Sequence, residues 1–362
     1  MSVIRVWGAG MLAVVLSWGA AGAADLAFLN HGRPVLDAHN CYPYDGRWDD
    51  RVRRALDSGF PVSIEQDLAW YVDPKTGKGR VVVSHMPNPT GREPALRAYF
   101  FDQVRPVIEK ALAENRRGEW PLIILHFDFK DTQPAILEAV WRLLGQYEPW
   151  LSTAIKTADP HELSPIDRKP ILVVTEDSDA QAKVFFDDVP VGGRLRLFGS
   201  AHTADPPPGV SSTQLPHWEA TAPPARLLKT HATNYRRWWN NSWWVVEQGG
   251  QLQAGAWTKA DDRRLRALVD YAHRQGYWIR FYTLDGFDAA QDRGWDANYN
   301  FGSLQRVIPR WRAAIAAGVD FIATDQYEAL SRELGQRDRA LRPSAASPAR
   351  HARLRQPVKA ST

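Results

Sequence analysis

Short apolar runs alternate with longer amphipathic stretches along most of the chain. The runs have the length of β-strands, and the stretches between them repeat their apolar residues every three or four positions, as helices do. This pattern predicts strands at 35–39, 61–68, 80–85, 121–130, 170–175, 194–198, 226–229, 277–285 and 319–325. It predicts helices at 47–58, 95–115, 134–145, 259–275 and 304–317.

Strands separated by helices are typical of parallel βα units. If 80–85 is an excursion from the main sheet, eight strands remain, which predicts an α/β fold of the TIM-type (β/α)8 barrel class. The expected organisation is a signal peptide at 1–24, a single barrel domain at 25–335 and a disordered basic tail at 336–362.

The stretch Pro121–Lys130 is central to the functional interpretation. It begins as an apolar run and ends as an alternation, so that His126, Asp128 and Lys130 share one face of a strand. Buried charges are costly unless they are paired or bind a metal. Asp128 and Lys130 are therefore either a structural ion pair or half of an anion-and-metal site, and this stretch alone does not decide between them.

Polar residues also follow the other predicted strands. They are His39, Asn40, Glu65, Asp67, His85, Asp285 and Asp325. In a (β/α)8 barrel the active site lies at the carboxyl ends of the strands, so we expect these side chains to meet there.

Glu65, Asp67 and Asp128 offer three hard oxygen ligands from two neighbouring strands. Like charges so close raise each other's pKa unless a cation lies between them. This set suits a divalent cation, Mg²⁺ or Ca²⁺. Zinc is disfavoured because Cys41 is the single cysteine, which also excludes an intrachain disulfide. The alternative is a polar strand end paired with arginines.

His39 and His85 flank this acidic set. Histidine titrates near neutral pH, so the two can serve as a general base and a general acid. In a phosphodiester reaction, Lys130 and the metal would neutralise non-bridging phosphate oxygens.

The ordered set of motifs resembles the PLC-like phosphodiesterase superfamily. That superfamily includes glycerophosphodiester phosphodiesterases, phosphatidylinositol-specific phospholipases C and sphingomyelinases D. The motifs are Ala38-His39-Asn40, Glu65-Gln-Asp67, Ser84-His85, Asp128-Phe-Lys130, 281–285 and 318–325.

The resemblance implies phosphodiester cleavage, with His39 and His85 as the acid–base pair and Glu65, Asp67 and Asp128 as metal ligands. It implies substrate contacts from Asn40, Lys130, Tyr282 and Asp285. Two departures, Asn40-Cys41 after the histidine and Asp at 128, move the likeness from glycerophosphodiesterases toward phospholipase C and sphingomyelinase D.

The start of the chain is typical of an exported protein. Arg5 precedes an apolar core and small residues suited to cleavage, so we expect a periplasmic or secreted protein. The net charge of +4 over 362 residues is dominated by the tail from Gln336 onward, which carries +6. With Arg5 also removed, the body carries −3. No basic stripe or motif predicts nucleic-acid binding there.

Sixteen tryptophans are present, with pairs at Trp238-Trp239 and Trp243-Trp244. One interpretation is a lipid-facing loop, because tryptophan favours the boundary between water and an apolar phase. The other is ordinary packing of a long loop over the barrel. The aromatic segment 295–301 poses the same choice.

The sequence therefore predicts an exported, metal-assisted phosphoric diester hydrolase that acts on a phospholipid or small phosphodiester, with contact to a membrane surface through aromatic loops. Two alternatives remain: a non-catalytic periplasmic barrel that binds lipid or glycan, and a glycoside hydrolase, since paired carboxylates also suit sugars. The head group, the choice of Mg²⁺ or Ca²⁺ and the oligomeric state stay open.

Overall fold

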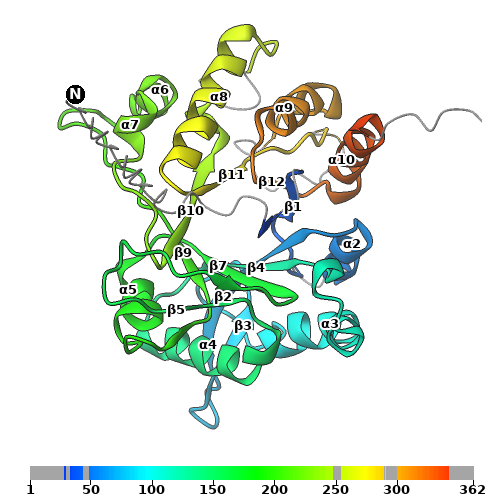
Figure 1. The fold of residues 1–362 in the computed structure, drawn as a ribbon, viewed down its shortest axis with the longest axis vertical. Coiled ribbons are helices and arrows are strands. Elements are labelled where there is room, and N and C mark those ends of the chain that lie inside the picture. The colour runs from blue at the N-terminus through cyan, green and yellow to red at the C-terminus, as the bar shows by residue number, and fades with distance from the viewer. Residues whose placement is uncertain are drawn as a thin grey trace, which may run out of the picture.

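A closed barrel of eight parallel strands forms the centre of the molecule (Figure 1). The computed structural model describes residues 28–29, 33–43, 49–247, 254–288, 290 and 300–341. The barrel strands are β1 (Val35–Ala38), β2 (Val62–Val72), β4 (Ile123–Phe129), β7 (Ile171–Thr175), β9 (Phe198–Ser200), β10 (Arg236–Ser242), β11 (Trp278–Tyr282) and β12 (Phe321–Thr324). The barrel closes because β1 pairs in parallel with both β12 and β2. The predicted TIM-type barrel is confirmed.

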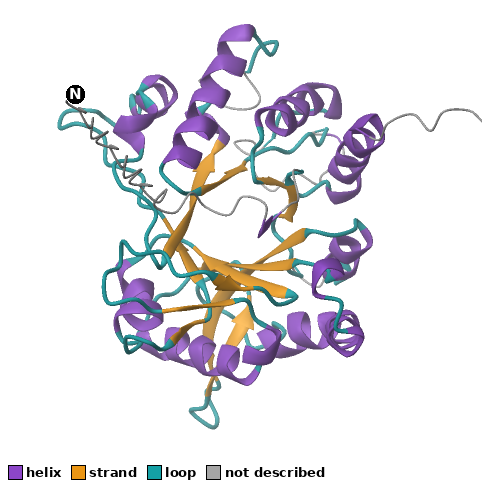
Figure 2. Cartoon of the chain, in the orientation of Figure 1, coloured by secondary structure: helices purple, strands orange, loops and turns teal. Residues whose placement is uncertain are grey.

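Helices surround the strands (Figure 2). They are α2 (Arg51–Asp57), α3 (Asp102–Glu114), α4 (Pro134–Gln146), α5 (Asp179–Ala182), α6 (Leu215–Thr221), α7 (Pro224–Leu227), α8 (Lys259–Arg274), α9 (Leu304–Ala317) and α10 (Tyr327–Leu341). Thr258 and Asp261 form a capping box at the start of α8. Gly318 ends α9 at φ 80°, a left-handed conformation that glycine adopts without a steric penalty.

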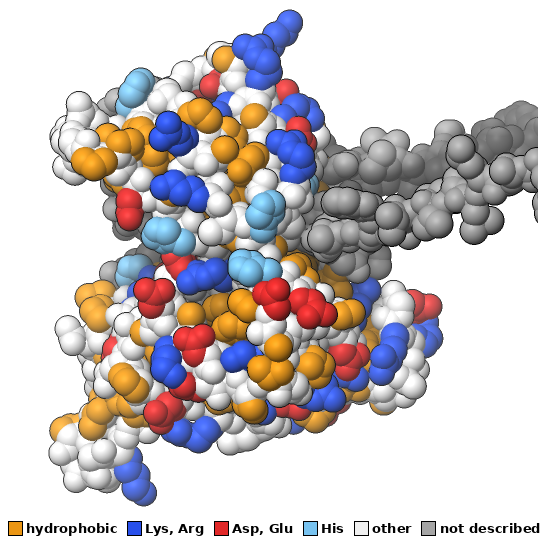
Figure 3. Space-filling model, turned by 60° about the vertical axis from the view of Figure 1, so that its left-hand side comes forward, with side chains coloured by type: hydrophobic (Ala, Val, Ile, Leu, Met, Phe, Trp, Pro, Cys, Tyr) orange, Lys and Arg blue, Asp and Glu red, His pale blue; other side chains and the backbone are white. Residues whose placement is uncertain are grey.

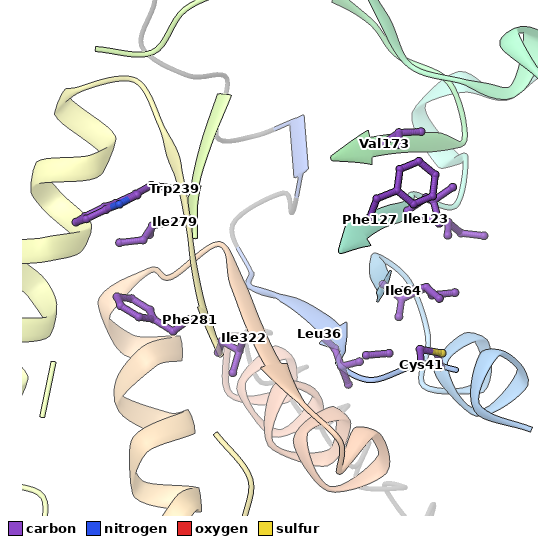
Figure 4. Packing of buried hydrophobic residues seen from close by; sticks show 14 of the residues in the cluster. Leu36, Cys41, Ile64, Ile123, Phe127, Val173, Trp239, Ile279, Phe281 and Ile322 are labelled. Carbon is purple, nitrogen blue, oxygen red and sulfur yellow. The ribbon is translucent and has the colours of Figure 1, made fainter. Parts of the chain in front are cut away.

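Strand alternation separates two apolar layers. The outward side chains pack beneath the helices, and Figure 4 shows members of this layer, among them Ile64, Phe127 and Ile279. The inward side chains form a smaller cluster that includes Val35, Ile124, Leu172, Trp278 and Phe321. These inward residues lie early in their strands, so the amino-terminal end of the barrel interior is apolar and the later inward positions remain for polar residues.

The segment 80–85 is an excursion, as expected. It forms β3 (Gly79–Val83), which pairs antiparallel with the far half of β2 and stands outside the closed barrel. A separate three-stranded sheet contains β5 (Thr153–Ile155), β6 (Ile166–Asp167) and β8 (Arg194–Leu195). The predicted barrel strand 194–198 is therefore divided: its start belongs to this small sheet, and the barrel strand begins only at Phe198.

The prediction for the sixth barrel strand was wrong. Residues 226–229 were expected as a strand, but Pro224–Leu227 is helix α7, and the barrel strand is β10. Trp238 and Trp239 are fully buried in β10, one inside the barrel and one beneath the helices. These two tryptophans are therefore core residues of a strand, and neither the lipid-facing loop nor the packed loop describes them.

Some predictions concern residues that the structure does not describe. The predicted signal peptide 1–24 and most of the aromatic segment 295–301 lie outside them. Helix α10 continues to Leu341, past the predicted domain end at 335, and the rest of the predicted tail is not described. Within the described part, no helix has both the length and the apolar character needed to cross a membrane. Figure 3 shows acidic, basic and apolar side chains interspersed on one face of the molecule.

Candidate active site

The predicted polar residues gather at the carboxyl end of the barrel. Parallel pairing aligns Glu65 of β2 with His126 of β4, and Asp67 with Asp128 one inward position later. Asn240 of β10 is aligned in the same way with Arg280 of β11. Because every barrel strand runs in the same direction, these layers face one another across the interior.

His39 pairs with Asp325, and we call this pair the His39 dyad. Each follows directly after a pair of aligned strand residues, Ala38 and Thr324. His39 Nδ1 lies 2.8 Å from Asp325 Oδ1, and Nε2 lies 3.7 Å from a Glu65 oxygen. Burial lowers the pKa of a histidine, but Glu65 and Asp325 outweigh it and raise the pKa of His39 to about 9. His39 is therefore an imidazolium at neutral pH and suits a general acid.

Three further groups hold the His39 dyad in place. Arg51 lies 3.4 Å from Asp325 and donates to the carbonyl of Asn40 at 2.6 Å. The Asn40 side chain donates to Asp325 at 3.1 Å, and its backbone N–H donates to Glu65 at 2.8 Å. Asn40 adopts a left-handed conformation with φ 52°, which asparagine tolerates better than most residues. These contacts direct the Asn40 side chain toward Asp325, and its predicted contact with substrate stays a prediction.

His85 forms a second pair, the His85 dyad, with Asp67. His85 Nδ1 lies 2.7 Å from Asp67 Oδ2, and about half of the His85 side chain is exposed. Tyr42 stacks on the His85 ring at 5.8 Å between centroids. Both histidines of the predicted acid–base pair are therefore oriented by a buried aspartate. One lies at the end of β1 and the other after β3.

Lys130 joins the His85 dyad to Asp128. Its Nζ lies 2.6 Å from Asp128 Oδ2 and 3.1 Å from Asp67 Oδ2. Burial, and then the charge of Asp128, raise the pKa of Asp67 to about 6. Burial would also raise the pKa of Asp128, but Lys130 lowers it below its usual range. Negative charge is therefore in excess here even with Lys130 between the two carboxylates.

Tyr282 and Asp285 contact the two members of the His39 dyad. Tyr282 stacks on the His39 ring at 6.4 Å between centroids. Asp285 is buried and accepts bonds from the Thr324 hydroxyl at 2.6 Å and the Asp325 N–H at 2.7 Å. Burial, followed by the charge of Asp325, raises the pKa of Asp285 to about 7. Asp285 thus supports Asp325, whereas Tyr282 lies against the His39 ring.

The predicted metal ligands do not form a compact set as they stand. Asp67 and Asp128 converge on Lys130 Nζ, but Glu65 receives Arg280 Nη2 at 3.1 Å. Among the described residues, the set whose ligand atoms lie within 4.8 Å of one another is His39, Asp285 and Asp325. That set already contains the hydrogen bond of the His39 dyad. Asp67 and Asp128 are therefore the better-placed oxygen donors for a cation, at the position where Lys130 supplies positive charge.

A network inside the barrel was largely missed by the sequence interpretation. We call its members, Asp37, His126, Glu176, Asn240 and Arg280, the interior network. Arg280 binds Asp37 through Nε and donates to Asn240 Oδ1 at 2.9 Å. Asn240 in turn donates to both oxygens of Glu176, at 3.0 and 2.9 Å, and His126 Nε2 lies 2.8 Å from Glu176 Oε1.

A sequence signal for part of this network exists. Asp37 follows Val35 at a spacing of two, and Arg280 lies between Trp278 and Tyr282 at the same spacing. Since alternate residues of a strand share a face, a polar residue two positions after a buried apolar one points into the barrel. Asn240 carried no such signal because β10 was not predicted as a strand.

No protein-family model matches the sequence, and no curated protein matches it. Among solved structures, a Plasmodium falciparum HPPK-DHPS triple mutant with pteroate matches at a TM-score of 0.43 and 9% identity, over 88% of this chain and 50% of that one. A second triple mutant of that protein matches at 0.42 and 11%, over 87% and 48%. A dihydropteroate synthetase with a product matches at 0.32 and 11%, over 85% and 94%.

The chain spans about half the length of the first two of these structures. At this identity and TM-score the likeness assigns no substrate or reaction to the chain.

These comparisons contradict the resemblance to PLC-like phosphodiesterases. No family model supports it, and the matching structures are dihydropteroate synthases. The predicted phosphoric diester hydrolase, its phospholipid or phosphodiester substrate and its membrane contact are corrected accordingly. The lipid- or glycan-binding barrel and the glycoside hydrolase gain no support either.

The physical reason lies in the motifs themselves. Each consists of one or two polar residues at a strand end. A (β/α)8 barrel gathers such residues at its carboxyl rim whatever reaction it performs. Motif order therefore followed barrel topology and did not identify a chemistry.

Proposed function

We propose that this chain is a barrel enzyme that performs general acid–base catalysis on a small substrate with a carboxylate or other electronegative oxygen. The observation that carries the proposal is the pair of histidine–aspartate dyads at one rim. An acid and a base at one site meet the demand shared by eliminations, isomerisations and group transfers: one atom loses a proton while another gains one.

The two dyads differ in a way that suits these separate roles. His39 is buried among carboxylates and is protonated at neutral pH, so it acts as the acid. His85 is half exposed and, among the described residues, has one carboxylate partner, Asp67, at hydrogen-bond distance, so it acts as the base. In each pair the aspartate fixes the ring through Nδ1 and leaves Nε2 as the atom that exchanges the proton.

Lys130 polarises the substrate oxygen in this proposal. Its ammonium lies between Asp67 and Asp128 and is one-fifth exposed. The excess negative charge beside it also suits a divalent cation, Mg²⁺ or Ca²⁺, held by Asp67 and Asp128. Such a cation would act as a Lewis acid on the same oxygen.

Turnover of a metabolite panel tests this function. The full-length chain is incubated with small carboxylates, hydroxy acids, amino acids and sugar acids, with pterin and p-hydroxybenzoate as a further arm, and products are detected by mass spectrometry. These last two accompany one of the matching HPPK-DHPS structures.

For any compound turned over, we expect His39→Gln and His85→Gln each to lower kcat about 10²- to 10⁴-fold, with a much smaller change in KM. His202→Gln, at a histidine that is 60% exposed, should leave the rate unchanged. Absence of turnover across the panel, or full activity in either dyad variant, would refute the acid–base assignment.

A further inference from the structure

One carboxylate of the interior network reaches the surface of the site. The Glu176 side chain is 25% exposed, whereas those of Asp37, His126 and Arg280 are exposed by 2% or less. Glu176 directly follows β7, so it lies at the same rim as the two dyads.

The interior network holds Glu176 in one orientation. Asn240 donates to both carboxylate oxygens, and His126 binds Oε1. The Asn240 amide cannot flip without losing the hydrogen bond that Arg280 donates to its oxygen. Since Arg280 is itself bound to Asp37, the carboxylate is supported from below by a continuous chain of paired groups. A preorganised acceptor of this kind costs little entropy when a ligand binds.

The charge of the network favours a ligand that donates hydrogen bonds. Two of the neighbouring carboxylates, those of Asp37 and Glu65, bind Arg280. Glu176 is the exposed carboxylate, and its described partners are the neutral Asn240 amide and His126. Of its two oxygens, Oε2 accepts one bond from a described side chain, that of Asn240, so it has room for another donor.

The order of the strands in the barrel places Glu176 near the other charged groups of the rim. In the ring order β1-β2-β4-β7-β9-β10-β11-β12, β7 stands opposite β12, the strand that leads to Asp325. β4, which leads to Lys130, lies beside β7. A small ligand at the rim therefore meets a cation at Lys130, a carboxylate at Glu176 and the His39 dyad across from them.

We propose that Glu176 is a specificity-determining residue that accepts hydrogen bonds from an ammonium or hydroxyl group of the substrate while Lys130 binds its carboxylate. The inference rests on the proposed function, because it uses the same site. It narrows the substrate class to small amino acids or hydroxy acids with the two groups at separate ends.

Binding of matched probes tests this assignment. The probes are butyrate, 4-hydroxybutyrate and 4-aminobutyrate, with the three-, five- and six-carbon series covering other spans, measured by calorimetry on the full-length chain. We expect at least one amino acid of the series to bind about tenfold more tightly than its alkanoate, as a charged hydrogen bond provides.

In Glu176→Gln, that ratio should fall toward one while binding of the alkanoate persists. Glu162→Gln, at an exposed surface glutamate, is the matched control and should leave the ratio unchanged. A circular-dichroism melt of Glu176→Gln separates loss of the fold from loss of the acceptor, and Glu176→Asp gives a second, shorter carboxylate.

Lys130→Gln distinguishes failure of this inference from failure of the proposed function. It should weaken every carboxylate probe by a similar factor. An unchanged amino-to-alkanoate ratio in folded Glu176→Gln, with all probes weakened by Lys130→Gln, would overturn the Glu176 role and leave the acid–base site standing. Probe affinities that are unchanged from wild type in both Lys130→Gln and Glu176→Gln would overturn the site itself, and with it this inference.

Discussion

At the scale of single residues, the site depends on charges that are buried together. His126 is 1% exposed and lies 2.8 Å from Glu176, 3.5 Å from Glu65 and 3.7 Å from Asp37. Burial and the neighbouring Arg280 disfavour its charged form, but the carboxylates outweigh both and raise the pKa of His126 to about 10. A buried imidazolium is thereby stable because its surroundings carry the opposite charge.

This raised pKa predicts a stability that depends on pH. A histidine whose folded pKa exceeds its unfolded value of about 6.5 stabilises the fold fully below that value. The contribution is lost as the pH rises toward about 10, and His39 acts in the same direction up to about 9. We expect the unfolding free energy of the metal-stripped protein to fall between pH 6.5 and 10, by an amount on the order of several kcal/mol.

Urea unfolding at pH 6, 8 and 10 measures this dependence. His126→Gln should flatten the pH profile relative to wild type, although it also lowers stability at pH 6. His202→Gln is the control, because that side chain is 60% exposed and lies at the surface. A profile for His126→Gln as steep as that of wild type would contradict the assigned charge.

At the scale of elements, helix ends are determined by local chemistry. Predicted and observed bounds agree for α9 and differ by one residue for α4 and α8. Glycines 276 and 318 follow α8 and α9 with φ of 85° and 80°. Because this conformation is costly for residues with a Cβ, glycine both permits and marks the end of a helix.

Two glycine substitutions separate conformation from crowding. At Gly318 an added Cβ meets no atom within 4 Å, so Gly318→Ala isolates the cost of the left-handed backbone, about 1 kcal/mol of unfolding free energy. Gly145 lies inside α4, and a Cβ there makes ordinary contact with Arg196 at 3.5 Å. Gly145→Ala should therefore be neutral or stabilise by up to about 1 kcal/mol. Urea unfolding compares them, and equal effects would contradict the conformational explanation.

At the scale of the whole molecule, barrel closure brings distant segments into one site. β1 pairs with β12, which places His39 against Asp325 across almost the entire chain. Parallel pairing of the neighbouring strands β2 and β4 sets Asp67 beside Asp128. Figure 1 shows β1 and α10, which are far apart along the chain, as neighbours. The charge at the rim is thus a property of the closed barrel.

Cation binding at Asp67 and Asp128 predicts a stabilisation of the whole fold. Mg²⁺ or Ca²⁺ at about 100 times its Kd should raise the Tm of chelator-treated protein by roughly 5 °C. Asp128→Asn should abolish the rise, whereas Asp205→Asn, at an exposed aspartate, should retain it. Differential scanning fluorimetry measures both. A Tm that does not change when cations are added would refute the proposed cation site. The positive charge between Asp67 and Asp128 would then be that of Lys130 alone.

The sequence alone determined the barrel class, most strands and helices, and the residues at the rim. Period-two and period-3.6 patterns are local, and the carboxyl ends of parallel strands must meet. The error in predicting β10 from the sequence also had a local cause. Trp238 and Trp239 read as a loop because both faces of β10 are buried, which removes the usual alternation.

Only the tertiary structure decided which polar residues pair with which. Asp325 pairs with His39, Glu65 binds Arg280, and Glu176 is the exposed member of a network whose residues lie on or directly after five barrel strands. The physical reason is that a buried charge is stabilised by whatever opposite charge lies within a few ångströms, and that neighbour is set by barrel closure rather than by sequence distance.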